Sequence, residues 1–158
     1  MIETVGVREM VTDLYHRYAE LLDEGPLEDW PELFTEDCSY RIIPRENHDR
    51  GLPLAVMRCD SRAMLRDRIL AVTKLSVYAP RRFLRLITNI RVGDEQGGEL
   101  SSRANYVVYQ TGEDGRTELF NAGRHLDRLV RDGGALRFRE KLCVFDTVMV
   151  PNSIVAPI

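Results

Sequence analysis

Apolar residues near the start of the chain recur at three- and four-residue steps, which is the pattern of amphipathic helices. A first helix is expected over residues 5–24, ended by Gly25-Pro26, and a short second one over about 27–34. Asp60 or Ser61 is expected to cap a long third helix that runs to about Tyr78. The residues expected on the buried faces are Met10, Val11, Leu14, Tyr18, Leu21 and Leu22, then Trp30, Leu33 and Phe34, then Met64, Leu65, Ile69, Val72 and Leu75.

The rest of the chain reads as strands and turns. Strands are expected at 38–43 and 54–59, with a polar loop between them, and then at 82–92, 99–110, 116–131 and 135–148. The last strand alternates, so we expect two sets of side chains on opposite faces. The inward set is Leu136, Phe138, Leu142, Val144 and Val148, and the outward set is Arg137, Arg139 and Lys141. On this interpretation, Leu142→Ala should cost about 2–5 kcal/mol as a core truncation.

This order of elements predicts an α+β protein, with helices packed on one face of a strongly curved, mainly antiparallel sheet. Such a sheet makes a cone whose interior is either a pocket or a packed core. The 158 residues fit a single domain, 1–158.

Composition and charge narrow the function classes. The chain is 44% hydrophobic and 30% charged, with a net charge of −3, which is typical of a soluble globular protein and not of a nucleic-acid binder. No apolar stretch is long enough for a membrane span, and the N-terminus has no apolar signal core. A cytoplasmic location without membrane or nucleic-acid partners is expected.

The cysteines and histidines argue against a metal site. Cys38, Cys59 and Cys143 are far apart and form no CxxC pair, and His16, His48 and His125 are equally dispersed. We therefore expect buried free cysteines, histidines 16 and 48 at the surface, no metal ligand and no bound iron in the isolated chain.

Three residues are candidates for acid–base chemistry. Glu140 and Asp146 share the parity of the inward residues of the last strand, so a buried carboxyl with a raised pKa is one interpretation. The other is an inward carboxylate paired with an arginine, or one near a rim where the strand leaves the core. His125 and Asp127 lie on one face of their strand. They are either a base and its orienting partner, or part of a polar ladder with neighbouring arginines at an exposed or partner-covered surface.

Five segments, in this order, resemble the β (small) subunit of Rieske non-haem iron aromatic-ring-hydroxylating dioxygenases. The resemblance covers about residues 10–158. The segments are WPELFTEDCSYRI (30–42), DSRAMLRDRI (60–69), RLITNI (85–90), FNAGRHLD (120–127) and EKLCVFDT (140–147) with the tail through Pro157-Ile158. Tyr40-Arg41, Glu46-Asn47-His48 and Gly51-Leu52 look closest to subunits of oxygenases for carboxylated aromatics such as terephthalate or salicylate.

The resemblance implies an NTF2-like (cystatin-like) cone and a structural subunit without catalytic residues. It implies that the Rieske [2Fe–2S] cluster and the mononuclear iron belong to a large α subunit, and that NAD(P)H acts through a reductase. It also implies an α₃β₃ assembly in which this chain associates with itself and with α. The alternative is a stand-alone isomerase, dehydratase or cyclase with Glu140, Asp146 or His125 as base and Tyr40 or Tyr106 as hydrogen-bond donor.

Overall fold

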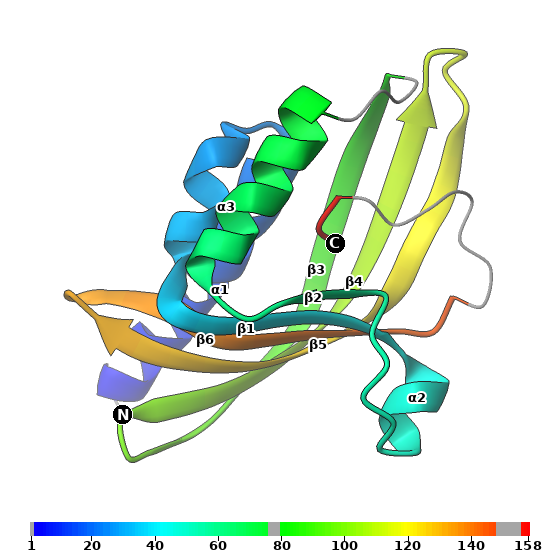
Figure 1. Ribbon diagram of the computed structural model, residues 1–158. Helices are drawn as coiled ribbons and strands as arrows, with labels where there is room; N and C mark the ends of the chain where they lie inside the picture. The colour runs from blue at the N-terminus through cyan, green and yellow to red at the C-terminus, as the bar shows by residue number, and fades with distance from the viewer. Residues whose placement is uncertain (1, 76–79, 148–155) are drawn as a thin grey trace.

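The computed structural model describes residues 2–75, 80–147 and 156–158. Helices α1 and α3 cover the concave face of a strongly curved six-stranded sheet (Figure 1). The strand order is β2-β1-β6-β5-β4-β3, in which β1 and β6 are parallel and the other neighbours are antiparallel. The elements are α1 (Ile2–Asp23), the 3-10 helix η1 (Leu27–Leu33), β1 (Phe34–Pro44), α2 (Arg45–Asp49), β2 (Met57–Cys59), α3 (Arg62–Leu70), the π-helical turn η2 (Ala71–Leu75), β3 (Arg81–Gln96), β4 (Glu99–Gly112), β5 (Thr117–Asp132) and β6 (Ala135–Phe145).

The predicted α+β architecture and its N-terminal helices are confirmed. The apolar stripe of α1 lies against the sheet, with Val11 and Tyr18 fully removed from solvent. Trp30 and Phe34 are also fully buried, and their rings meet edge to face at 5.0 Å between centroids. Burial of these large side chains removes apolar surface from water and so favours folding.

The segment from the end of β1 to the end of α3 differs from expectation in four ways. The polar loop contains the short helix α2, and β2 has only three residues because only these pair with β1. Ser61 caps α3 as predicted, accepting a hydrogen bond from the Met64 amide, but α3 ends at Leu70 and passes into η2. Met64 is 42% exposed, so its predicted place in the core is wrong. The end predicted for this helix, at Tyr78, lies outside the described residues.

A β-bulge in β6 reverses the predicted faces of its second half. Leu129 pairs with Phe138, whereas the preceding residue of β5, Arg128, pairs with Glu140, so β6 carries one extra residue at Arg139. One extra residue moves every later side chain to the other face, because the side-chain period of a strand is two. Lys141 therefore points inward and is buried, and Leu142 points outward and is half-buried. The further predicted inward residue, Val148, lies outside the described residues.

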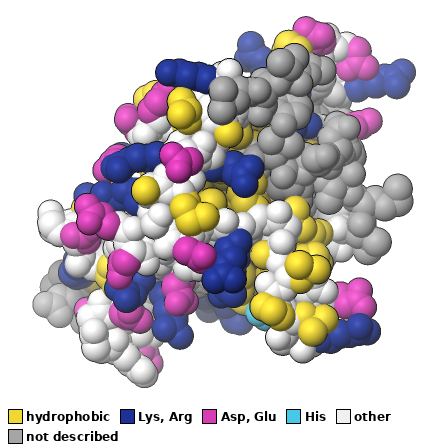
Figure 2. Space-filling view, in the orientation of Figure 1, with side chains coloured by type: hydrophobic (Ala, Val, Ile, Leu, Met, Phe, Trp, Pro, Cys, Tyr) yellow, Lys and Arg dark blue, Asp and Glu magenta, His cyan; other side chains and the backbone are white. Residues whose placement is uncertain are grey.

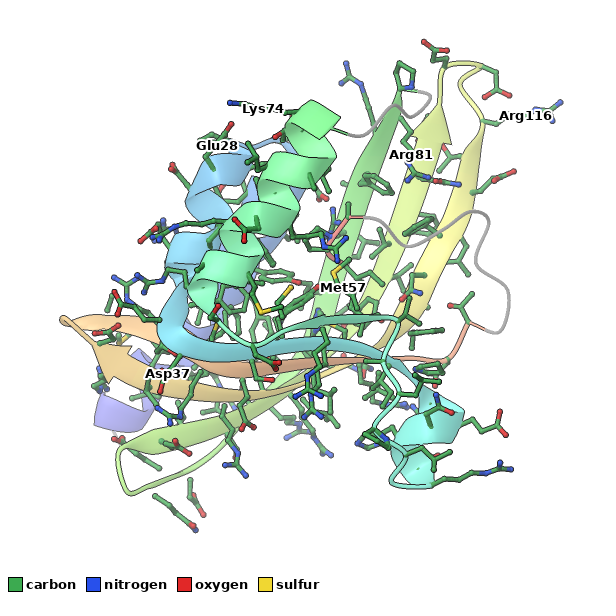
Figure 3. All side chains as sticks on the ribbon, in the orientation of Figure 1. Glu28, Asp37, Met57, Lys74, Arg81 and Arg116 are labelled. Carbon is green, nitrogen blue, oxygen red and sulfur yellow. The ribbon has the colours of Figure 1, made fainter. Side chains whose placement is uncertain are left out.

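The end of the chain returns into the cone. Ile158 is 1% exposed, and its amide donates to the Tyr40 hydroxyl at 2.9 Å. The carbonyl of Pro157 accepts a hydrogen bond from Arg85 Nη2 at 2.6 Å. The C label of Figure 1 marks this position, between the helices and the upright strands. Figure 3 shows side chains from the helices and from the sheet in the space between them.

Basic and acidic side chains alternate over the helices instead of gathering in one patch (Figure 2). Arg66 of α3, for example, reaches Glu32 of η1 at 2.6 Å. Apolar side chains are exposed in the loop before β2, where Leu54 is 74% exposed, and also on α3, β3 and β5. Among the described helices, none combines the length and apolar character that crossing a membrane requires.

Candidate functional site inside the cone

Glu140 and Asp146, predicted to face inward, lie on the outside. Glu140 is 45% exposed on β6 and its carboxylate is 3.5 Å from Arg128 Nε. Asp146 is also 45% exposed and pairs with Arg45 and with Arg124, the latter at 3.6 Å. The prediction of a buried carboxyl is therefore wrong at both positions. Each carboxylate does pair with an arginine, but on the outside of the sheet and not facing inward. The bulge at Arg139 explains why Glu140 points outward. It moves the residues that follow it in β6 to the opposite face from the one that strict alternation predicts.

His125 does lie inside, on the same face of β5 as Asp127, so their predicted common face is confirmed. The polar-ladder interpretation is wrong, because the two residues are 1% and 4% exposed. The imidazole lies between the rings of Tyr106 and Tyr15, at 4.5 and 5.9 Å between centroids. Its Nδ1 is 3.4 Å from the Cys143 sulfur. Burial holds the pKa of His125 well below its usual value, and the Lys141 ammonium lowers that pKa further.

Asp127 is held by two donors that come from other elements. Lys141 Nζ donates to its Oδ2 at 2.8 Å, and the Tyr15 hydroxyl donates to the same oxygen at 2.6 Å. Tyr15 also contacts the hydroxyl of Ser102 at 3.0 Å. Burial raises the pKa of the Asp127 carboxyl, although the neighbouring ammonium opposes that rise. Lys141 and Tyr15 both already form hydrogen bonds within the chain.

Lys141 is an interior residue that the sequence pattern places on the outer face. Its ammonium lies 4.3 Å from the ring centroid of Phe138 and 4.4 Å from that of Tyr18, so aromatic faces surround a charge already paired with Asp127. No sequence signal marks the bulge that turns this lysine inward. Its position opposite Asp127 follows only from the pairing of β5 with β6.

A second polar group joins α1 and the chain end to the sheet. Arg85 of β3 forms a buried ion pair with Asp23 of α1, at 2.5 Å between Nη1 and Oδ1. The hydroxyls of Tyr18 and Tyr40 both donate to the Ile158 oxygen. Burial raises the pKa of both tyrosines well above their usual value, so they remain neutral donors.

The described residues do not fit an iron site. They contain no group of three or more histidine, cysteine or acidic side chains placed to hold a metal ion. A Rieske cluster needs two cysteines and two histidines, and a mononuclear iron site needs two histidines and a carboxylate. His125 and Cys143 come together as a single pair, and burial raises the pKa of Cys143 to about 12, which keeps it a thiol.

The remaining cysteines and histidines are placed as predicted. Cys38 and Cys59 are buried and free, as is Cys143. His16 is exposed on α1, and the His48 side chain is 37% exposed on α2. Neither histidine lies near the interior residues described above.

Comparison with known proteins places the whole arrangement in one family. The family model described as the ring-hydroxylating beta subunit matches residues 17–152. The anthranilate 1,2-dioxygenase small subunit of Burkholderia cepacia is 37% identical over 92% of this chain and 90% of its own length. A terephthalate 1,2-dioxygenase terminal oxygenase β subunit of Comamonas sp. is 30% identical over 89% of this chain and 92% of its own.

Comparison with solved structures gives the same family and the same fold. A chain from Novosphingobium aromaticivorans, assigned as the β subunit of an aromatic-ring-hydroxylating dioxygenase, superposes with a TM-score of 0.87 at 38% identity, covering 99% of this chain and 98% of that one. A protein of the same organism assigned as a scytalone dehydratase shares the fold, with a TM-score of 0.73 at 17% identity over 99% of both chains. That second likeness concerns the fold alone. The family model and the relatives above 30% identity show that this chain belongs to the ring-hydroxylating dioxygenase β-subunit family.

Proposed function

We propose that this chain is the non-catalytic structural subunit of an aromatic-ring-hydroxylating dioxygenase. The observation that carries the proposal is what surrounds the candidate base in the described part of the cone. Ile158 and Pro157 occupy its interior, and His125, the interior candidate base, is stacked between two tyrosine rings. A base can act only on a substrate within hydrogen-bond reach, and here that space holds the chain's own atoms. On this proposal residues 1–158 form one domain that contributes no catalytic residue.

The small-subunit family implies a large oxygenase subunit as partner. In the proposed assembly, three large and three small chains form an α₃β₃ hexamer. The Rieske cluster and the mononuclear iron belong to the large subunit, and NAD(P)H supplies electrons through a reductase. The assembled dioxygenase acts in the cytoplasm. Its substrate is a carboxylated aromatic compound, a proposal supported by the relatives named for anthranilate and terephthalate.

Native mass spectrometry with iron analysis tests this proposal on tagged chain recovered from its own host. We expect an iron-containing hexamer with equal numbers of large and small chains. A lone, iron-free oligomer of this chain would overturn the proposal, and so would stoichiometric iron in this chain after its separation from the large one.

The stand-alone acid–base enzyme is not favoured. Two of its three candidate bases, Glu140 and Asp146, lie on the outer surface in ion pairs with arginines. The hydroxyls of its candidate donors are also engaged, Tyr106 with Asn121 Oδ1 at 2.6 Å and Tyr40 with Ile158.

A further inference from the structure

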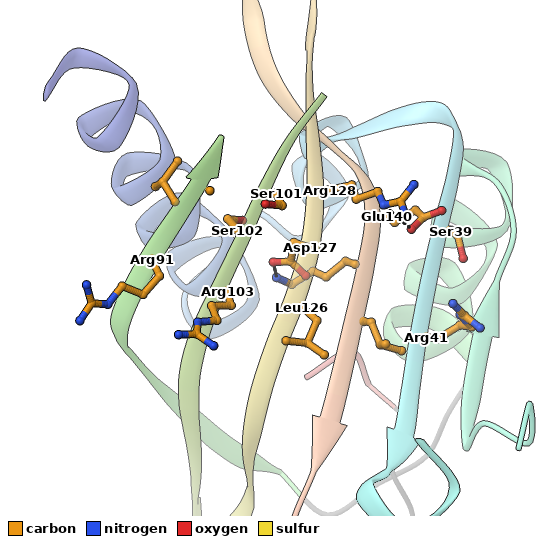
Figure 4. Close-up of a pocket in the computed structure, with 14 residues that line it drawn as sticks. Ser39, Arg41, Arg91, Ser101, Ser102, Arg103, Leu126, Asp127, Arg128 and Glu140 are labelled. Atoms are coloured by element: carbon orange, nitrogen blue, oxygen red, sulfur yellow. Dashed lines mark hydrogen bonds and ion pairs between the residues drawn. The ribbon is translucent and has the colours of Figure 1, made fainter. Parts of the chain in front are cut away.

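One cross-strand row on the outer face of the sheet has an unusual composition. Directly opposite residues on neighbouring strands form this row. Across the sheet from β3 to β1, its members are Arg91 (β3), Arg103 (β4), Leu126 (β5), Leu142 (β6) and Arg41 (β1). The row thus has two arginines at one end, two leucines in the middle and one arginine at the other end. Figure 4 shows this face, with Arg91 and Arg103 on one side, Arg41 on the other and Leu126 between them.

The three arginines have no acidic partner within the part of the chain that the structure describes. Other outer-face arginines do, such as Arg128, which contacts both Glu99 and Glu140. No ion pair or side-chain hydrogen bond joins Arg41, Arg91 or Arg103 to another described residue. Arg91 and Arg103 stand directly opposite each other, a like-charge arrangement that destabilises a sheet. An external anion at this position would offset that repulsion.

The row lies in a groove of about 560 Å³. Its floor includes Leu126 and Leu142, both half-buried, and the acid at its margin, Glu140, is already paired with Arg128. Gly93 helps to shape one wall, because a Cβ at this position would lie 2.2 Å from the Ser101 hydroxyl. The groove therefore offers an apolar centre between two unneutralised positive ends.

We infer that this groove binds an acidic segment of the large oxygenase subunit, an inference that rests on the proposed function. Neighbouring strands are about 4.8 Å apart, so the three strand steps from Arg103 to Arg41 span about 14 Å. One small carboxylate cannot reach both ends. An extended segment advances about 3.3 Å per residue, so acids four positions apart reach both, with an apolar residue over the leucines between them.

The first test measures assembly of the complex with the groove charges reversed. Arg91→Glu with Arg103→Glu, and separately Arg41→Glu, are compared with Arg8→Glu plus Arg17→Glu, a control pair of arginines on α1. We expect each groove variant to raise the dissociation constant for the large subunit at least about 30-fold, and the control to change it less than about 3-fold. The reversals lie on exposed or half-buried positions, and matching melting curves verify that each variant folds.

The second test identifies the occupant. Ser101→Cys places a reactive thiol in the groove, while the three native cysteines are buried. A photo-crosslinker on this thiol should join an acidic peptide of the large subunit, located by mass spectrometry. A link to a second copy of this chain would overturn the inference, and so would groove variants that assemble like the wild type. Either result leaves the proposed function standing, whereas failure of the wild-type chain to assemble at all overturns both.

Discussion

Lys141 and Asp127 form a salt bridge of 2.8 Å in which both side chains are completely removed from solvent. The lysine comes from β6 and the aspartate from β5, and Tyr15 of α1 donates to the same carboxylate oxygen. The pair therefore ties the first helix to the two central strands. Desolvating both charges costs several kcal/mol, which their attraction and the added hydrogen bond must offset.

Breaking that pair from one side should be strongly destabilising. Lys141→Met removes the ammonium that balances the buried Asp127 carboxylate, so we expect the free energy of unfolding to fall by about 3–5 kcal/mol. Chemical denaturation measures it. Arg58→Ala, which breaks the exposed Arg58–Asp60 pair, is the control and should cost no more than about 1 kcal/mol. Equal losses for the two variants would contradict the assignment of Lys141 to the interior.

The bulge in β6 predicts different costs for two leucines. Leu129 is fully buried on the inner face of β5, whereas Leu142 is half-buried on the outer face of β6. Leu129→Ala should cost about 2–5 kcal/mol, and Leu142→Ala no more than about 1 kcal/mol. Urea titration of both variants checks this. A loss of about 2–5 kcal/mol for Leu142→Ala would contradict the bulge and support a register in which Leu142 faces the core.

Gly123 is the place where the backbones of β5 and β6 approach too closely for a side chain. A Cβ there would lie 2.0 Å from the Val144 carbonyl oxygen, and backbone cannot move aside as a flexible side chain can. We expect Gly123→Ala to lower the melting temperature markedly, with a loss of about 2 kcal/mol or more.

The matched control is Gly6→Ala, because Gly6 lies in α1 and a Cβ added there would meet nothing within 4 Å. Alanine is the better helix former, so this variant should be neutral or slightly stabilised, by up to about 1 kcal/mol. Similar melting temperatures for both variants would rule out the close approach at Gly123.

His125 should make stability depend on pH below about 6.5. Because burial lowers the pKa of the folded-state imidazole, the unfolded chain binds a proton that the folded chain does not, in the window below its usual value of 6.5. Its contribution to stability is complete above that value and is lost as pH falls, by at most about 1.4 kcal/mol per pH unit.

Denaturation of the wild type and His125→Gln between pH 7.5 and 5 isolates this effect. The variant should show a shallower slope, whatever its stability at pH 7.5. Asp127 does not account for the difference, because its raised pKa makes stability change in the opposite direction with pH. Parallel curves for the two proteins would contradict a neutral, buried His125.

Local patterns in the sequence determine most of the elements. The stripe that includes Val11 and Tyr18 specifies α1, and Ser61 marks the start of α3, because periodicity and capping depend on residues within one turn of each other. Gly-rich turns separate β3 to β6 for the same local reason. The five segments that resemble the β subunits also indicate the family, which the comparisons confirm.

Tertiary structure alone decides which polar groups meet. Glu140 lies outside and Lys141 inside because of one extra residue in β6, and a bulge is set by pairing with β5 and not by the residue at Arg139 itself. Tertiary structure also decides the contact between Ile158 and Tyr40, which are 118 positions apart in the sequence. It likewise brings together the three arginines of the outer-face row, which come from β1, β3 and β4. Contacts between distant residues depend on register and chain path, and neither is encoded in any single stretch of sequence.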